Sequence, residues 1–300
     1  MDIVEVRDLC KSYAGRPVVN GVDLSVAEGE IFGILGPNGA GKTTTVEMIG
    51  GLRTRDRGQV KVAGFDPAMG DRGLRELLGM QLQESRQPAK ITVREAIELY
   101  RTFYRAPRDT GELLTRFGLM SRADTRFEQL SGGQQQRLSV ALALVGNPRV
   151  AILDELTTGL DPAARHEIWD FLSDLAADGV TIVLVTHSME EAQHLCDRVA
   201  IIDGGRVRAL DTPARLAHSR SDSIISFTTH QADRVHGLRE LLSVVELVVA
   251  GSEVTVRSTA SGPAEVLAHL TGSGIPFEAL RISAPSLDDA YLALTRKESR

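Results

Sequence analysis

The sequence predicts an α/β fold over most of the chain, followed by a smaller α+β domain. Up to about residue 216, short apolar segments of strand length alternate with longer segments of helical periodicity, as in a sheet flanked by helices. A glycine-rich run over 36–44 joins one such strand to one such helix. Beyond a polar stretch, the order of strands and helices changes. We therefore expect a first domain over 1–216, a linker over 217–222 and an accessory domain over 223–300.

The elements of the first domain follow from the period of their apolar residues. Apolar runs and period-two alternation predict strands, whereas apolar residues three and four positions apart predict helices. The helical pattern dominates the middle of the chain, which predicts a helical insertion at about 84–135. Strands are expected at 3–6, 18–26, 30–35, 150–153 and 181–185, and helices at 44–51, 93–103, 111–117 and 163–177.

The accessory domain carries a mixed pattern of short strands and amphipathic helices. Such a mixture is typical of a small α+β domain, and the alternative is an irregular helical extension of the first domain. Strands are expected at 223–228, 244–249, 253–257 and 277–282, and helices at 232–242, 263–270 and 286–296.

The composition excludes several classes of protein. Acidic residues outnumber basic ones, 40 to 34, and the net charge of −6 argues against a broad nucleic-acid-binding surface. No apolar stretch approaches the roughly 18 residues of a membrane span, and the N-terminus lacks the pattern of a signal peptide. Cys10 and Cys196 fit small core residues rather than a disulfide framework. We therefore expect a cytoplasmic protein that reaches a membrane only through a partner.

The glycine-rich run fits the pattern G-x-x-x-x-G-K-[ST], which is a phosphate-binding P-loop. Its glycines let backbone N–H groups converge on phosphate oxygens, and the helix that follows directs its positive end at them. Lys42 is expected to reach the β- and γ-phosphates, and the Thr43 hydroxyl to bind Mg²⁺. This pattern predicts binding of a nucleoside triphosphate by a loop of nine residues, namely Gly36, Pro37, Asn38, Gly39, Ala40, Gly41, Lys42, Thr43 and Thr44.

Two carboxylates follow the buried strand at 150–153. Asp154 suits the role of holding Mg²⁺, directly or through water. Because neighbouring strand residues point to different sides, Glu155 is free for another task, the polarisation of the water that attacks the γ-phosphate. A solvated acidic strand end is the alternative, and it is improbable after a complete P-loop.

A third motif indicates which class of P-loop protein this is. The run Leu130-Ser131-Gly132-Gly133-Gln134-Gln135-Gln136-Arg137 resembles the signature motif of ATP-binding cassette (ABC) ATPases. A serine and two glycines at a helix start offer free N–H groups, a hydroxyl and a helix dipole to a phosphate. The resemblance implies a P-loop core with an antiparallel β-subdomain and a helical insertion. It also implies that Ser131, Gly132, Gly133 and Gln134 contact ATP held by the P-loop of a second copy, in a head-to-tail homodimer.

The same resemblance implies roles for four further residues. His187, directly after the strand at 181–185, matches the switch histidine that contacts the γ-phosphate. Gln83 matches the glutamine that contacts Mg²⁺ and the attacking water, with Gln81 as a competitor. Asp161 resembles the aspartate that links the two sites, and Tyr13 stands where an aromatic ring stacks on adenine. Lys42, Gln83, Glu155 and His187 are thus the expected catalytic residues, and Thr43, Gln83 and Asp154 the expected Mg²⁺ ligands.

One position departs from the family pattern. The family usually has proline after the catalytic glutamate, and this chain has Leu156. Proline would have fixed the backbone φ angle, so the loop is expected to be less rigid here. Both carboxylates are retained, so we expect ATP hydrolysis to survive.

The resemblance also implies a biological role. One nucleotide-binding domain without a membrane segment resembles a separately encoded ATPase subunit, whose permease would contact a surface at about 83–127. The stretch at 82–85 and the tail at 285–294 resemble ATPase subunits of ABC-2-type exporters, including daunorubicin-type drug exporters. The expected partners are an ABC-2-type permease and a second copy of the chain, with a drug-like, lipid or polysaccharide cargo and attachment to the cytoplasmic face of the membrane.

Three alternatives remain open. The first is the ATPase subunit of an importer, which is the nearest rival to an exporter. The second is a non-transport ABC ATPase that acts on nucleic acid or the ribosome, but such proteins commonly carry two cassettes or long coiled-coil insertions. The third is a non-hydrolysing nucleotide-binding scaffold, which the presence of Glu155 and His187 disfavours.

Overall fold

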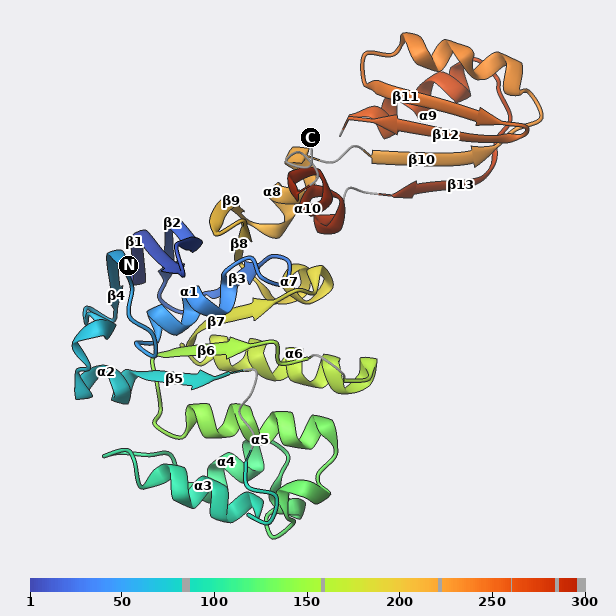
Figure 1. Ribbon diagram of the computed structural model, residues 1–300. Coiled ribbons are helices and arrows are strands. Elements are labelled where there is room, and N and C mark those ends of the chain that lie inside the picture. Colours follow the sequence, from blue (N-terminus) through green and yellow to red (C-terminus); the bar gives the residue numbers. More distant parts are fainter. Residues whose placement is uncertain (83–86, 158–159, 221–222, 260, 284–285, 296–300) are drawn as a thin grey trace. The chain divides into compact units, whose positions relative to one another are not determined.

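The computed structural model describes residues 1–82, 87–157, 160–220, 223–259, 261–283 and 286–295 (Figure 1). Its contacts divide the chain into two compact units, Met1–Thr212 and Pro213–Arg300. We describe each unit by itself. Among the described residues, no helix has both the length and the apolar character needed to cross a membrane.

A six-stranded sheet, in the order β5-β6-β7-β3-β8-β9, forms the centre of the first unit. Its strands pair in parallel except at the edge, where β8 and β9 are antiparallel. Every residue of β3, β6 and β7 is buried, as is expected of parallel strands with both faces covered. The strands are β3 (Ile31–Leu35), β5 (Leu78–Gln81), β6 (Val150–Asp154), β7 (Thr181–Thr186), β8 (Arg198–Asp203) and β9 (Arg206–Asp211).

A second sheet confirms the expected antiparallel β-subdomain. It has the order β2-β1-β4 and is formed by β1 (Asp2–Tyr13), β2 (Arg16–Ala27) and β4 (Arg57–Val62). One hydrophobic core contains residues of both sheets together with α1 (Lys42–Ile49). Strands β1 and β2 extend beyond the expected ranges of 3–6 and 18–26, because exposed polar residues interrupt the apolar pattern near their ends.

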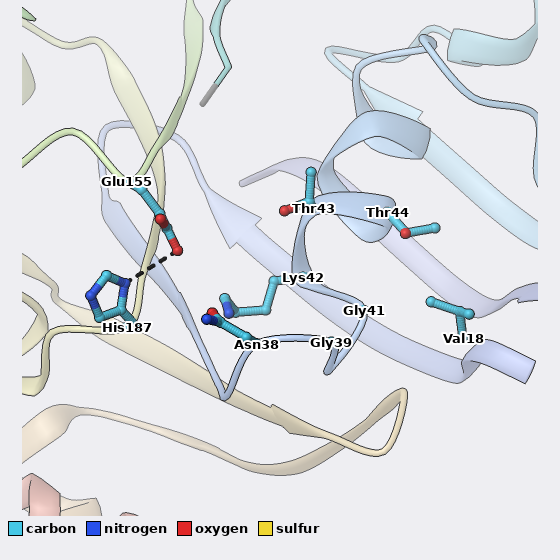
Figure 2. A pocket seen from close by; sticks show the side chains of 9 residues that line it. All are labelled: Val18, Asn38, Gly39, Gly41, Lys42, Thr43, Thr44, Glu155 and His187. Atoms are coloured by element: carbon cyan, nitrogen blue, oxygen red, sulfur yellow. Dashed lines mark hydrogen bonds and ion pairs between the residues drawn. The ribbon is translucent and has the colours of Figure 1, made fainter. Parts of the chain in front are cut away.

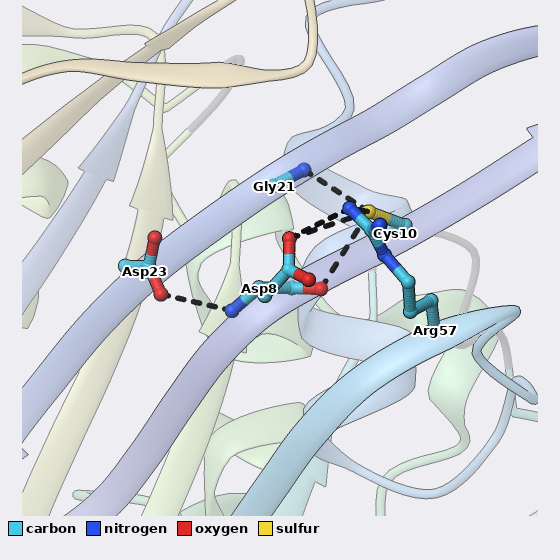
Figure 3. Close-up of polar contacts among 5 residues, drawn as sticks. All are labelled: Asp8, Cys10, Gly21, Asp23 and Arg57. Atoms are coloured by element: carbon cyan, nitrogen blue, oxygen red, sulfur yellow. Dashed lines mark hydrogen bonds and ion pairs between the residues drawn. The ribbon is translucent and has the colours of Figure 1, made fainter.

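A bulge in β1 interrupts this antiparallel sheet (Figure 3). Asp8 takes a left-handed conformation, φ +47°, and its backbone N–H donates to Asp23 Oδ1 at 2.8 Å. Cys10 then returns to the ladder, where its sulfur accepts the Gly21 N–H at 3.2 Å and lies 3.5 Å from Arg57 Nη2. An extra residue of this kind increases the local twist of a strand. The bulge thus bends β1 on its way to Tyr13.

Helices surround the six-stranded sheet and form the expected insertion. In the insertion, α3 starts with a capping box in which Thr92 and Glu95 exchange hydrogen bonds. Packing of α5 against β5 requires Gly79, because a Cβ there would lie 2.0 Å from the Ala143 carbonyl oxygen. The helices and 3₁₀ turns are η1 (Pro67–Met69), α2 (Arg72–Leu77), α3 (Val93–Arg101), α4 (Thr110–Arg116), η2 (Met120–Arg122), η3 (Phe127–Gln129), α5 (Gly132–Leu144), α6 (Pro162–Ala177) and α7 (Met189–Leu195).

The second unit contains a four-stranded antiparallel sheet in the order β11-β12-β10-β13. The chain order strand, 3₁₀ helix, strand, strand, helix, strand gives the split βαβ arrangement of ferredoxin-like domains. Its own core is separate from that of the first unit. The elements are α8 (Pro213–Arg220), β10 (Ser223–Thr228), η4 (Ala232–Glu240), β11 (Val244–Ala250), β12 (Glu253–Ser258), α9 (Gly262–Gly272), β13 (Glu278–Ser283) and α10 (Leu287–Thr295).

Two expectations for this region differ from the structure. The stretch expected to be a linker, 217–222, is helical up to Arg220, and the division into units falls earlier, after Thr212. The polar composition had suggested a loop, but α8 packs against α10 and thereby gains a partner far along the chain. The helix expected at 232–242 is a 3₁₀ helix over Ala232–Glu240.

Candidate functional site

Three parallel strands bring the predicted site residues to one edge of the central sheet. Leu35 at the end of β3 lies opposite Thr186 of β7, and Asp154 at the end of β6 lies opposite Val185. The P-loop leaves β3, Glu155 follows β6 and His187 follows β7. The carboxyl ends of adjacent parallel strands are the usual place for a ligand in an open α/β sheet.

These segments line a cavity of about 500 Å³ (Figure 2). In this view the side chains of Glu155, His187, Lys42 and Asn38 gather on one side, and Val18 lies at the far end. Six of the nine predicted P-loop residues line the cavity with their backbone or side chains. The lining residues are Val18, Asn38, Gly39, Gly41, Lys42, Thr43, Thr44, Glu155 and His187.

The backbone of the loop requires glycine at two positions. Gly41 precedes α1 with φ +97°, and a Cβ there would lie 2.4 Å from the Val18 carbonyl oxygen. At Gly36 a Cβ would lie 2.1 Å from the Ile202 carbonyl oxygen. Both distances are far below any van der Waals contact. Glycine therefore allows the loop to lie close against β2 and β8.

Lys42 is a buried cation that lies within the loop itself. Its Nζ donates to the carbonyl oxygens of Gly36 at 2.8 Å and Pro37 at 3.1 Å. Burial lowers the pKa of Lys42, while the carboxylates of Glu155 and Asp154 act in the opposite direction. Neutral carbonyls are weaker partners for an ammonium group than charged oxygens are. A phosphate in the cavity would therefore offer Lys42 a stronger hydrogen bond than the ones it makes here.

Asp154 is a buried carboxylate at the end of β6. Its backbone N–H donates to Gln81 Oε1 at 3.2 Å, and its Oδ2 accepts the Thr43 hydroxyl at 3.4 Å. Its Oδ1 is buried and has no hydrogen-bond partner among the described residues. Burial, followed by the charge of Glu155, raises the pKa of Asp154 to about 6.

The oxygens of Thr43 and Asp154 fit Mg²⁺. Mg²⁺ prefers hard oxygen ligands, and in nucleotide sites it takes one or two protein oxygens together with phosphates and water. The unpartnered Oδ1 of Asp154 is available for such a bond. When bound, the ion would neutralise charge on the β- and γ-phosphates.

Glu155 and His187 contact each other across the cavity. His187 Nδ1 lies 3.2 Å from Glu155 Oε1, as the dashed line in Figure 2 shows. Glu155 has φ +51°, a left-handed conformation that is rare outside glycine, and its backbone N–H donates to the Val185 carbonyl at 2.8 Å. A residue that precedes proline is restricted to extended conformations, and Leu156 removes that restriction. The departure at Leu156 is thus compatible with the backbone turn at Glu155.

The signature motif lies outside this cavity. Ser131 begins α5 with a capping box: its hydroxyl accepts the Gln134 N–H, and Gln134 Oε1 accepts the Ser131 N–H at 3.1 Å. Ser131 and Gly132 are exposed, while Gly133 and Gln134 are half-buried. None of the four lines the cavity that holds Lys42. A role for them in phosphate contact would need a second molecule.

Three other predicted residues have separate positions. Tyr13 is partly exposed at the end of β1 and does not line the cavity. Asp161 caps α6, with its side chain accepting the Ala164 N–H at 3.0 Å. Gln83 lies outside the described residues. Its competitor Gln81 is described, and it is buried against the backbone of Asp154.

Comparison with known proteins identifies the family. Residues 19–158 match the family described as ABC transporter. Over 301 residues, the chain is 38% identical to the Nod factor export ATP-binding protein I of Rhizobium meliloti (strain 1021), covering 98% of this chain and 88% of that protein. The chain belongs to the ABC transporter family of ATP-binding proteins. ATP hydrolysis is the general activity of the family, and this ABC protein is an ATPase.

Further relatives extend this result. The ABC protein is 33% identical to the daunorubicin resistance ATP-binding protein DrrA3 of Streptomyces coeruleorubidus, covering 97% of this chain and 95% of that one. Among solved structures, an ATP-binding subunit of an ABC transporter superposes with a TM-score of 0.66 and 29% identity, over 72% of this chain and 92% of the other. A dimeric bacterial ABC transporter cassette superposes with a TM-score of 0.63 and 28% identity, over 70% of this chain and 98% of the other.

Sequence reasoning missed one residue that lines the cavity and one that contacts a predicted residue outside it. Val18 lines the cavity, and nothing but its place in an alternating strand marked it. Arg53 holds Tyr13: its Nη1 donates to the tyrosine hydroxyl at 2.5 Å, and its Nε donates to Glu47 on α1 at 2.5 Å. Arg53 is one of three arginines at alternate positions in a polar stretch, with Arg55 and Arg57, and no spacing rule pairs it with a residue 40 positions earlier.

Replacement of Glu155 by Gln separates ATP binding from hydrolysis. Because the P-loop and Lys42 remain, we expect Glu155→Gln to bind ATP with near-normal affinity while its turnover falls by about 10²-fold or more. Phosphate release and equilibrium ATP binding measure the two effects. Glu190→Gln is the matched control, since Glu190 is exposed and pairs with Arg165 away from the cavity. Near-normal hydrolysis by Glu155→Gln would remove Glu155 from the mechanism.

Asp154 makes the stability of the nucleotide-free protein depend on pH. Its pKa of about 6 lies above the ordinary value of 3.8, so the folded state retains a proton that the unfolded state has lost. Protonated Asp154 thereby adds at most about 3 kcal/mol to the free energy of unfolding. This stabilisation is fully present below about pH 4 and is lost as the pH rises through about 6.

Asp154→Asn removes this titration. Without Mg²⁺ and nucleotide, we expect the Tm of Asp154→Asn to increase relative to the Tm of the unsubstituted protein as the pH rises from 4.5 to 7. Thermal unfolding across this range measures the difference. Asp124→Asn, at an exposed position, is the control. A difference in Tm that stays constant with pH would show that Asp154 does not titrate in this window.

Proposed function

We propose that this protein is the ATP-hydrolysing subunit of an exporter and that it drives a separate membrane permease of the ABC-2 type. One observation supports this most: relatives named for Nod factor export and for daunorubicin resistance match 97–98% of this chain, so the likeness includes the second unit as well as the first. The solved ATPase cassettes match 70–72% of the chain. The proposal therefore rests on relatives that share both units.

Each site residue has a separate role in ATP hydrolysis. The P-loop backbone and Lys42 bind the phosphates, and Thr43 and Asp154 hold Mg²⁺. Glu155 accepts a hydrogen bond from the attacking water and orients it toward the γ-phosphate. His187, now 3.2 Å from Glu155, contacts the γ-phosphate and registers its loss. Gln83 completes this set as a ligand of Mg²⁺ and the water, as the family resemblance implies.

The ATP site is completed by a second copy of the chain. Ser131 and Gly132 are exposed at the start of α5, Gly133 is half-buried, and none of the three lines the cavity that holds Lys42. In a head-to-tail pair they would reach the γ-phosphate bound by the partner, with Asp161 near the same interface. Tyr13, held by Arg53, stacks on the adenine ring. ATP binding thus favours a closed dimer, and hydrolysis lets it open.

The cargo is a drug-like, lipid or polysaccharide molecule, and the protein works at the cytoplasmic face of the membrane. The names of the relatives support this breadth, since one refers to Nod factor export and another to daunorubicin resistance. Specificity lies with the permease, because no cavity of the ATPase other than the phosphate site is needed for the reaction. ATP hydrolysis supplies the free energy.

An apolar groove on the first unit is the proposed contact for the permease. A cavity of about 570 Å³ is lined by the end of α1, by α2 and β5, and by two aromatic residues after α3, Phe103 and Tyr104. Leu52 and Phe103 are 60% and 67% exposed there. Exposed apolar residues around a groove are typical of an interaction site. The groove includes part of the surface at about 83–127 that the sequence predicts.

Substitution of Phe103 tests both the groove and the export role. We expect Phe103→Arg to lose the permease on co-purification from detergent-solubilised native membranes, while the purified ATPase keeps its basal rate, because Phe103 is outside the phosphate site. Mass spectrometry of the bound proteins is the measurement. Met120→Arg is the control, since Met120 is also exposed but lies outside the groove.

The identity of the recovered protein decides the function. An ABC-2-type permease that is recovered with the unsubstituted chain and with Met120→Arg, but lost with Phe103→Arg, would support the proposal. Recovery of an importer permease or of ribosomal proteins would contradict it, while leaving the ATPase chemistry unaffected.

A further inference from the structure

Glu191 is a carboxylate buried outside the cavity, on the helix that follows His187. It lies in the first turn of α7 and is fully buried. Its Oε2 has no hydrogen-bond partner among the described residues. Burial of a carboxylate costs free energy unless its remaining contacts offset that cost. The contacts of the other oxygen, Oε1, show which parts of the chain Glu191 holds together.

Two buried donors from different segments meet at Glu191 Oε1. The Thr157 hydroxyl donates to it at 2.8 Å, and the indole Nε1–H of Trp169 donates at 3.2 Å. Thr157 is two residues after Glu155, and Trp169 lies on α6. One oxygen therefore joins three segments: the turn that follows β6, helix α6 and helix α7.

The start of α7 is also tied to the end of β7, next to His187. The Ser188 hydroxyl accepts the Glu191 N–H at 3.2 Å, and the Ser188 N–H donates to Thr186 Oγ1 at 2.9 Å. These bonds fix the backbone on both sides of His187. The Glu191 carboxylate thus extends from the segment of His187 to the segment of Glu155, whose side chains are 3.2 Å apart in the cavity.

The backbone at Glu155 needs support of this kind. Its φ of +51° is disfavoured for a residue with a Cβ, and such a conformation persists only where the surrounding structure holds it. The bond from its own N–H to the Val185 carbonyl holds the chain on one side. Because Leu156 lacks the fixed φ of proline, the bond from Thr157 to Glu191 restrains the chain on the other side.

We propose that Glu191 is a positioning residue for ATP hydrolysis. Through the Thr157 hydroxyl, it holds the turn that carries Glu155 against the helix that follows His187. The inference rests on the role proposed for Glu155. Without this bond, Glu155 would less often orient the attacking water, and the loss would appear in kcat. ATP binding would be little affected, because neither Glu191 nor Thr157 lines the cavity of the P-loop.

Removal of the Thr157 hydroxyl tests the inference. We expect Thr157→Val, which keeps the β-branched shape, to lower kcat by about tenfold or more and to change the KM for ATP by less than about threefold. Steady-state phosphate release with Mg²⁺ and ATP measures both. Thr157→Ser retains the hydroxyl and should restore kcat to nearly the unsubstituted value.

Trp169→Phe is the matched control for a purely structural role. It removes the other hydrogen bond to the same oxygen and more side-chain volume, but it leaves the turn after Glu155 in place. We expect the Tm to fall in both Thr157→Val and Trp169→Phe, and kcat to fall only in Thr157→Val. An equal loss of kcat in the two variants, or a loss in neither, would overturn the inference.

Substitution of Glu191 itself gives a second measurement. Glu191→Gln keeps an oxygen that can accept both bonds, so its kcat should stay within about threefold of the unsubstituted value. Glu191→Met has a similar length without that oxygen, and its kcat should fall as far as that of Thr157→Val. The double variant Thr157→Val, Glu191→Met should be no slower than either, because both changes remove the same bond. Near-normal turnover by Glu191→Met would contradict the inference.

Glu155→Gln separates this inference from the proposed function. If Glu155→Gln is inactive and Thr157→Val turns over normally, the positioning role of Glu191 is overturned and the proposed function stands. If Glu155→Gln hydrolyses ATP at a near-normal rate, the role of Glu155 is rejected, and the inference that depends on it is rejected as well.

Discussion

The parallel pairing of β3 with β7, and of β7 with β6, is the constraint on which the rest of the site depends. This register ends the three strands at the same edge, so that segments more than 100 residues apart in the chain surround one cavity. Lys42, Asp154, Glu155 and His187 owe their proximity to it rather than to any direct attraction. The strands are buried on both faces, and their pairing is therefore strongly specified.

Charged side chains gather at the cavity that these strands form. Lys42 is buried on neutral carbonyls, Asp154 keeps one oxygen without a partner among the described residues, and Glu155 contacts His187. The bonds of Lys42 to neutral carbonyls are weaker than a bond to a phosphate oxygen would be, and the Asp154 oxygen is available to a divalent cation. The arrangement is thus compatible with the proposed binding of a nucleotide phosphate and Mg²⁺.

The sequence predicted what depends on local spacing. The P-loop, the apolar strands and the capping serine of α5 each lie within a few residues, and the fold built from them is confirmed. Contacts between distant segments were not predictable in this way. The bond from Arg53 to Tyr13 has no signal in spacing. The stretch at 217–222, where the sequence predicts a linker, overlaps the end of α8, whose partner α10 lies some 70 residues away. The pairing of strands in the second unit likewise required the structure.

In the head-to-tail dimer that we propose, the P-loop of one copy works with the signature motif of the other. Complementation tests it directly: Lys42→Ala and Ser131→Arg, each inactive alone, are mixed and their ATPase rate is measured. A head-to-tail dimer of the two contains one site with both motifs intact, so the mixture should regain about a quarter of the unsubstituted rate. A mixture as inactive as its components would mean that each chain must supply both motifs to its own site, and would contradict the account.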